Sequence, residues 1–223
     1  MERHFEQDME ALKQSLLSMA SHAEAAVQES VEALLQRDDA RVQAAKARDN
    51  VIDRMELEID DLAISLLARA PLATDLRLVT VAMKISQNLE RVGDEATKIA
   101  KRAHELNAEP PLKEVVDIAG LSRAAVELLK ASLDAFVQRD TVTAREIIAR
   151  DKAVNALNKE IHRQLLDQMM AEREAITRCL NLMVVSKALE RVGDHAANIA
   201  EEVVFLYEAQ DIRHAKNLAA QPA

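Results

Sequence analysis

Aromatic residues, glycine and proline are scarce in this chain of 223 residues. Only 2% of the residues are aromatic, and there are three glycines and four prolines. A β protein needs many turns that depend on glycine and proline, so this scarcity argues against one. Alanine, leucine, glutamate, lysine and arginine dominate instead, which is typical of long helices packed through aliphatic side chains. The sequence therefore predicts an all-helical protein.

The chain also lacks the features of secreted, membrane-spanning and nucleic-acid-binding proteins. A single cysteine, Cys179, excludes an internal disulfide and fits a reducing compartment. No apolar run reaches the ~18 residues of a membrane span, and residues 1–5 contain no apolar signal region. The net charge of −9 is opposite to the basic footprint that nucleic acids require. We expect a soluble cytoplasmic protein with no nucleic-acid partner.

A twelve-residue segment occurs twice, at 89–100 and again at 189–200, with nine identical positions. Each copy contains a Glu-x-x-x-Asp motif with a glycine directly before the aspartate, and these are two of the three glycines. The Arg-Asp pairs that begin at positions 37 and 48 also recur, 102 positions later. Repetition over this distance indicates two similar halves, each with a carboxylate pair at an equivalent point.

The breaks between periodic segments define the helices. Asp38 can cap the second helix, either Thr74 or Asp75 the third, and Pro110-Pro111 forms the strongest break at the midpoint of the chain. Six helices are predicted, at about 5–36, 39–69, 74–107, 112–138, 141–170 and 174–209. The simplest architecture is two tandem three-helix antiparallel bundles with internal pseudo-symmetry. We expect domains at 1–109 and 112–212, followed by a flexible tail at 213–223.

The repeated carboxylates are predicted to share a cation. Helical periodicity places Glu90 and Asp94 on the face that is apolar two turns earlier, at Val79 and Met83. Two carboxylates at i and i+4 repel each other, and partial burial makes the repulsion worse. The glycine between them costs the helix about 1 kcal/mol relative to alanine, so its presence requires a close neighbour or room for an ion.

Matching polar residues on the second and fifth helices complete two sets. Asp49 and Asp53 are again four residues apart, and an antiparallel bundle can bring them to the level of the repeated motif. The predicted metal ligands are Asp49, Asp53, Glu90 and Asp94 in the first half, and Asp151, Asn155, Glu190 and Asp194 in the second. Asn155 stands where an acid is expected, which predicts a weaker second site.

The ligand chemistry limits the choice of ion. Oxygen ligands favour Mg²⁺, Mn²⁺, Ca²⁺ or iron over Zn²⁺ or copper. Arg91 and Arg191 point about 100° away from the neighbouring glutamate, so we expect them to be surface residues or to contact partners. His195 is expected at the surface rather than as a ligand. The chain contains no nucleophile–base arrangement and no phosphate-cradling glycine loop, so no catalytic residues are predicted.

The duplicated Leu-Glu-Arg-Val-Gly-Asp motif, the segment 195–201 after its second copy and the segment 71–77 resemble the PhoU family. The likeness covers nearly the whole chain. It implies two three-helix bundles that bind metal at E/D-x-x-x-D motifs, a homodimer, and peripheral association with the membrane through partners. It also implies an adaptor between a phosphate ABC transporter and a sensor histidine kinase, which represses the phosphate-starvation response when phosphate is plentiful.

A second class of function is compatible with the same residues. The carboxylates could belong to a carboxylate-bridged metal enzyme or to a metal store in a helical bundle. Oxygen consumption with bound iron would favour that alternative, whereas co-purification with transporter or kinase components would favour the adaptor.

Overall fold

The computed structural model describes residues 2–69 and 72–213. Within them there are six long helices and no strand, which confirms the all-helical prediction. The helices are α1 (Glu2–Gln36), α2 (Asp39–Leu67), α3 (Ala73–Asn107), α4 (Ile118–Gln138), α5 (Thr141–Ala171) and α6 (Ile176–Glu208). A single 3-10 turn, Arg173–Ala175, leads into α6.

The repeated Arg-Asp pairs form the same turn in both halves. Arg37 and Arg139 adopt left-handed conformations, with φ of 56° and 60°, and end α1 and α4. The carboxylate of Asp38 then accepts a hydrogen bond from the Ala40 amide at 2.9 Å, and Asp140 caps the first turn of α5 in the same way. These aspartates satisfy amides that a helix start leaves unpaired, so the predicted capping of the second helix by Asp38 is confirmed.

The starts of the fourth and third helices differ from the prediction in ways that their caps explain. The fourth helix begins at Ile118 rather than 112, because the chain stays irregular after Pro111 until Asp117 caps the Gly120 amide at 2.8 Å. The third helix begins at Ala73, and neither predicted residue is its N-cap. Asp75 instead acts from inside the first turn, where its carboxylate accepts from the Leu72 amide at 3.2 Å.

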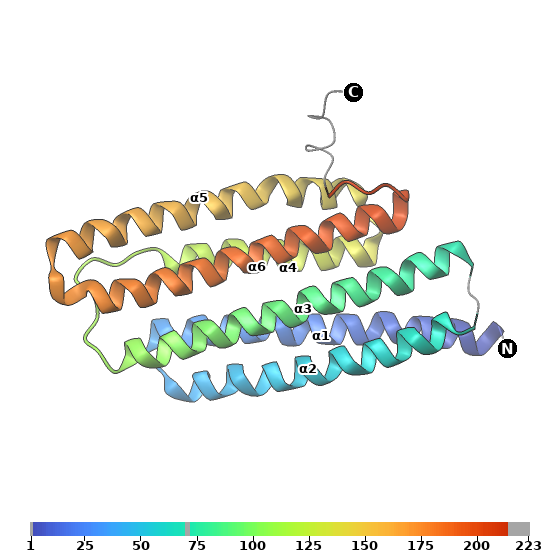
Figure 1. The fold of residues 1–223 in the computed structure, drawn as a ribbon, viewed down its shortest axis with the longest axis horizontal. Coiled ribbons are helices and arrows are strands. Elements are labelled where there is room, and N and C mark those ends of the chain that lie inside the picture. The colour runs from blue at the N-terminus through green and yellow to red at the C-terminus, as the bar shows by residue number, and fades with distance from the viewer. Residues whose placement is uncertain (1, 70–71, 214–223) are drawn as a thin grey trace, which may run out of the picture.

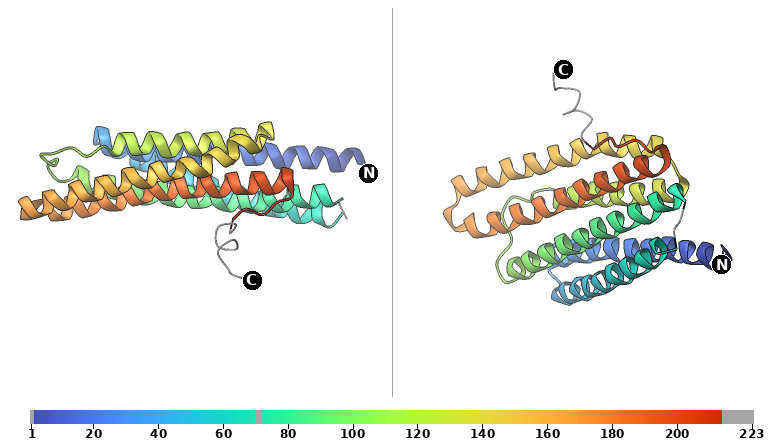
Figure 2. Two further views of the ribbon diagram at one scale, coloured as in Figure 1. Left: turned by 90° about the horizontal axis from the view of Figure 1, so that it is seen from above. Right: turned by 45° about the vertical axis from the view of Figure 1, so that its right-hand side comes forward.

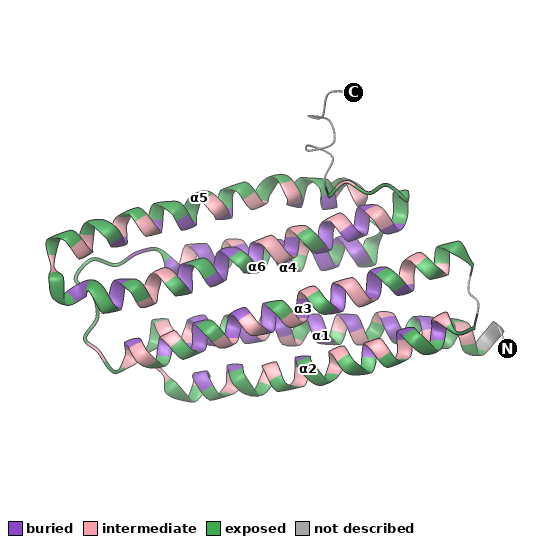
Figure 3. Cartoon of the chain, in the orientation of Figure 1, coloured by how far each residue is buried: buried purple, intermediate pink, exposed green. Residues whose placement is uncertain are grey.

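The six helices form two antiparallel three-helix bundles side by side (Figure 1). In the described part of the chain, α2 contacts only α1 and α3 among the long helices, and α5 contacts only α4 and α6. The bundles meet where α3 packs on α6 and α1 packs on α4; seen from above, α1 and α4 lie on one side of α3 and α6 (Figure 2). The outer faces of α2 and α5 are largely exposed (Figure 3).

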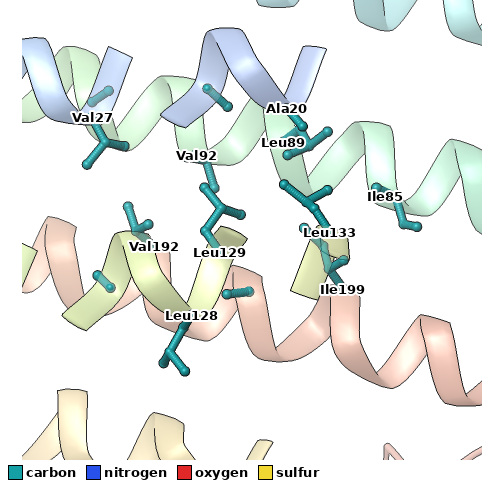
Figure 4. Close-up of a cluster of buried hydrophobic side chains, with 14 of the residues drawn as sticks. Ala20, Val27, Ile85, Leu89, Val92, Leu128, Leu129, Leu133, Val192 and Ile199 are labelled. Carbon is teal, nitrogen blue, oxygen red and sulfur yellow. The ribbon is translucent and has the colours of Figure 1, made fainter. Parts of the chain in front are cut away.

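A continuous hydrophobic core joins the two bundles. Leu89 and Val92 of α3, Leu129 of α4, Val192 of α6 and Ala20 of α1 belong to one cluster of buried side chains (Figure 4). All five side chains are 3% exposed or less. The bundles are therefore distinct in topology but share one apolar interior.

The proposed division into domains at 1–109 and 112–212 stays a prediction. The predicted tail falls on 214–223, outside the described residues, except for Arg213. Within the described ranges, no helix has both the length and the hydropathy needed to cross a membrane.

Candidate functional site

The predicted ligands of the first half lie on α2 and α3, which pack against each other. Asp49 and Asp53 come from α2, and Glu90 and Asp94 come from α3. A Cβ built on Gly93 would stand 2.7 Å from Oδ1 of Asp49, closer than real Cβ contacts. The glycine therefore allows the Asp49 carboxylate to lie against the backbone of α3, which is the close approach that its presence in a helix required.

Two carboxylate oxygens of this group, on α2 and α3, are buried without a hydrogen-bond partner, namely Asp49 Oδ1 and Glu90 Oε2. Nε of Arg91 lies 3.3 Å from the Glu90 oxygen as an ion pair, but no hydrogen bond forms between them. A buried carboxylate oxygen without a donor is destabilising. A proton or a bound cation would remove that penalty, so the chemistry of these carboxylates fits a cation.

Burial of these carboxylates also shifts their pKa values. Burial raises the pKa of Asp49, and the charges of Asp53 and Asp94 raise it further. Burial also raises the pKa of Glu90, again with Asp94 and Asp53 adding to the effect. The four predicted residues therefore act on one another as a single electrostatic group.

Glu56 belongs to the same group, although the sequence analysis did not include it. Burial raises its pKa, followed by the charges of Asp60, Asp53 and Asp94. A signal for it was available in the sequence, since Glu56 and Asp60 again have the Glu-x-x-x-Asp spacing. Glu56 also lies three residues after Asp53, which brings the two to neighbouring positions on one face of α2.

The second half repeats the arrangement with fewer charges. Oδ1 of Asp151 on α5 is buried without a partner and lies 3.2 Å from where a Cβ on Gly193 would stand. Its other oxygen accepts a hydrogen bond from Nδ2 of Asn155 at 2.7 Å. On α6, Lys187 pairs with Glu190. Asn155 adds no charge and Lys187 offsets the charge of Glu190, while the weaker affinity of the second site stays a prediction.

Asp194 carries the largest shift in either group. Burial, followed by the charges of Glu190 and Asp151, raises its pKa to about 6. Ionisation of Asp194 is thus less favourable in the folded protein than in the unfolded chain.

We expect Asp194→Asn to stabilise the metal-free protein, with a gain that grows between about pH 4 and 6 and is constant above pH 6. A folded pKa of about 6, against an ordinary value of 3.8, means that the ionised side chain opposes folding at neutral pH. This destabilisation is small near pH 3.5, where the side chain is mostly protonated in both the folded and the unfolded chain, grows as pH rises from about 4 to about 6, and is complete above pH 6. Because the side chain is partly exposed, solvent screening limits the gain to about 1 kcal/mol.

Denaturant titrations of Asp194→Asn and wild type with chelator, between about pH 3.5 and 8, measure this difference. Asp61→Asn removes an exposed carboxylate on α2 and is the matched control. A gain that stays constant over the whole pH range would contradict the assignment.

The side chains do not form a preassembled ion cage. In the described ranges, no three histidine, cysteine, aspartate or glutamate side chains are grouped closely enough to hold a metal ion. Ion binding at Asp49, Asp53, Glu90 and Asp94, or at their counterparts, therefore requires rotation of side chains and stays a prediction.

The two arginines of the repeat are exposed, as expected of surface residues, and each also pairs with carboxylates of the chain. Arg91 folds back over the carboxylates, with Nε 3.3 Å from Glu90 and Nη1 3.4 Å from Asp94. Arg191 crosses to the other bundle, where Nη1 lies 3.2 Å from the buried Glu95. Both side chains remain about half exposed, at 54% and 51%, and a contact with a partner stays a prediction for each.

The expectation that His195 is a surface residue is wrong. Its Nδ1 lies 3.0 Å from Oδ1 of Asn88, and the side chain is partly buried between α3 and α6. The position equivalent to His195 in the first copy is Glu95, which pairs with Arg191. The repeat therefore supplies the polar contacts between the bundles as well as the carboxylate groups.

A model of the family described as "PhoU domain" matches residues 16–103 and 118–203, one copy in each half. The chain belongs to the PhoU family. A PhoU homologue of Pseudomonas aeruginosa, named as a phosphate-specific transport system accessory protein, is 36% identical over 95% of this chain and 88% of its own length. A homologue of Clostridium acetobutylicum with the same name is 35% identical over 93% of this chain and 96% of its own length.

The fold also matches a solved PhoU structure. The crystal structure of PhoU from Pseudomonas aeruginosa superposes with a TM-score of 0.89 at 36% identity, covering 92% of this chain and 100% of that one. The resemblance seen in the duplicated motif is thereby confirmed, and both PhoU-domain matches contain one copy of it.

Proposed function

We propose that this PhoU-family protein regulates phosphate uptake and represses the phosphate-starvation response. In this role it is a cytoplasmic, homodimeric adaptor between a phosphate ABC transporter and a sensor histidine kinase. The observation that carries the proposal is the family match in both halves, together with relatives named as accessory proteins of phosphate-specific transport. Membership of this family supports a role in the regulation of phosphate transport.

The adaptor is proposed to act without turning over a substrate. Its most distinctive chemistry is the pair of carboxylate groups, one on the packed helices α2 and α3 and the other on α5 and α6. Long helices packed through a shared core supply extended rigid faces, which suit contacts with other proteins.

We further propose that the carboxylate groups bind hard cations such as Mg²⁺, Mn²⁺ or iron, with Zn²⁺ less favoured. The buried oxygens of Asp49, Glu90 and Asp151 that have no hydrogen-bond donor support this proposal, as do the raised pKa values around them. A bound cation would neutralise the charge of the carboxylates and fix the separation of the paired helices.

A deletion strain tests the regulatory role. Without the gene, transcription of phosphate-starvation genes is expected to be high even in phosphate-rich medium, because the repressing contact is lost. A reporter assay at high and low phosphate measures this, and the wild-type gene on a plasmid should restore repression. Full repression in the deletion strain would overturn the adaptor role and leave the metal enzyme or metal store as the better account.

A further inference from the structure

A groove of about 360 Å³ lies between α3 and α6, with residues of α3 and α6 as its lining, and it borders the second carboxylate group only through Lys187, which pairs with Glu190. Leu180 and Val184 line it from α6, one helical turn apart, and they are 51% and 39% exposed. Ile176, a further turn back along α6, is 37% exposed. Apolar side chains aligned at this spacing form a strip rather than the scattered single residues of an ordinary surface.

The other half of the protein shows that this strip is not required by the fold. The positions equivalent to Leu180 and Val184 are Thr80 and Lys84. Nζ of Lys84 lies 2.9 Å from Oε2 of the buried Glu202 and 5.2 Å from the ring centre of Phe205, so the chain closes this end of the α3–α6 contact with its own residues. The equivalent positions are thus polar in the first half, where Lys84 pairs within the chain, and apolar and exposed in the second half.

Three cations border the apolar strip. Lys98 of α3 and Lys187 and Arg191 of α6 line the same groove, and their side chains are 47%, 47% and 51% exposed. Their partner carboxylates lie beneath them, since Glu95 and Glu190 are only 6% and 10% exposed. The surface presented to solvent is therefore cationic, although the chain as a whole has a net charge of −9.

We propose that this groove docks an amphipathic helix of a partner protein that carries acidic residues beside its apolar face. The inference rests on the proposed adaptor role, for which it names the docking surface and the chemistry of the segment that occupies it. Apolar side chains of the partner helix would cover Leu180 and Val184, as in other helix-in-groove complexes. Its carboxylates would meet Lys98, Lys187 and Arg191, which supply charge complementarity.

The chemistry of the groove distinguishes this occupant from a second copy of the chain. Two copies meeting through this groove would bring the three cations of each into proximity, and like charges at an interface oppose association. An acidic helix instead gains from the same cations. Because the rim is exposed, these charges are expected to act mainly on the association rate and on its salt dependence.

Site-specific photo-cross-linking in cells identifies the occupant. A photoreactive amino acid replaces Leu180 in one strain and Thr80, its exposed equivalent, in the control strain. We expect adducts from position 180 only, joined to a helical segment of another protein with acidic residues beside its apolar face. No adduct, equal adducts from both positions, an adduct to a second copy of this chain, or an adduct to a segment without acidic residues would each overturn the proposal.

The partner identified by cross-linking is then purified, and its affinity for variants of this protein measures the contribution of the strip. Leu180→Thr with Val184→Thr is expected to weaken binding by at least about tenfold, because both apolar contacts are lost. Leu57→Thr with Ile64→Thr removes two apolar side chains of α2 that are more exposed, at 67% and 59%, and should bind like wild type. Lys98→Gln with Lys187→Gln should slow association and reduce its salt dependence.

The outcomes separate this proposal from the adaptor role itself. If Leu180→Thr with Val184→Thr keeps its helical content and thermal stability but binds as tightly as wild type, the groove is not the docking surface. If the strain that lacks the gene still represses the starvation genes fully at high phosphate, the adaptor role fails instead.

Discussion

Replacing Leu129 by alanine is expected to destabilise both halves of the protein at once. Leu129 is 0% exposed and lies where α4 meets the helices of the other bundle, beside Leu89 and Val92 of α3 (Figure 4). Truncating a fully buried leucine removes its burial energy and leaves a cavity, which together cost about 2–5 kcal/mol. Because the cavity opens in the shared core, the loss should appear in a single cooperative transition.

Denaturant unfolding followed by circular dichroism measures the free energy of unfolding. Leu57→Ala truncates a leucine that is 67% exposed on α2, and its effect should stay within about 0.5 kcal/mol. Two separate unfolding transitions, of which Leu129→Ala moves only one, would show that the halves do not depend on the common core.

Replacing Glu90 and Asp94 together by Gln and Asn is expected to abolish most cation binding in the first half. The amides keep the shape of the side chains but remove two of the four charges that would hold the ion. Because the affinity of oxygen-ligand sites follows the number of charged ligands, we expect affinity for Mn²⁺ or Mg²⁺ to fall by roughly 100-fold or more. The metal-free variant should be at least as stable as wild type, since burial and mutual repulsion raise the pKa of Glu90 in the native protein.

Calorimetric titration of the metal-free protein gives the affinity, and thermal unfolding with and without the ion gives an independent measure. An ion present at 100 times its dissociation constant stabilises the folded wild type by about 2.7 kcal/mol, and this increment should disappear in the variant. Glu6→Gln with Glu10→Gln changes an exposed pair with the same spacing on α1 and should bind the ion like wild type. Glu190→Gln with Asp194→Asn should lose less, since Asn155 already weakens the second group. Equal affinities for wild type and the Glu90/Asp94 variant would exclude the first site.

The helices were predictable wherever local chemistry decides them. Asp38 and Asp140 cap the helices that follow, as their positions after the two arginines suggested. The start of α4 was not predictable, because proline shows where a helix cannot continue but leaves the next start open. Only the Asp117 cap fixes Ile118 as the first helical residue.

The candidate site was predictable in its composition but not in its detail. The repeat and the glycines point to Asp49, Glu90 and Asp94 because helical periodicity fixes which face a residue occupies. Periodicity says nothing about where a long side chain ends, and Arg91 therefore folds onto carboxylates that it was expected to point away from. His195 was misjudged for a related reason, since the helix that covers it comes from the other bundle.

The sequence by itself determined the helical class, the two-fold repetition, the hinges and the carboxylate pairs, because each depends on local periodicity, capping or the duplication itself. Only the tertiary structure decided that α3 and α6 pack together, that Arg191 reaches Glu95, and that Val184 stays exposed while its equivalent, Lys84, pairs with the buried Glu202. These features depend on contacts between residues about one hundred positions apart, and the repeat does not specify how its two copies pack against each other.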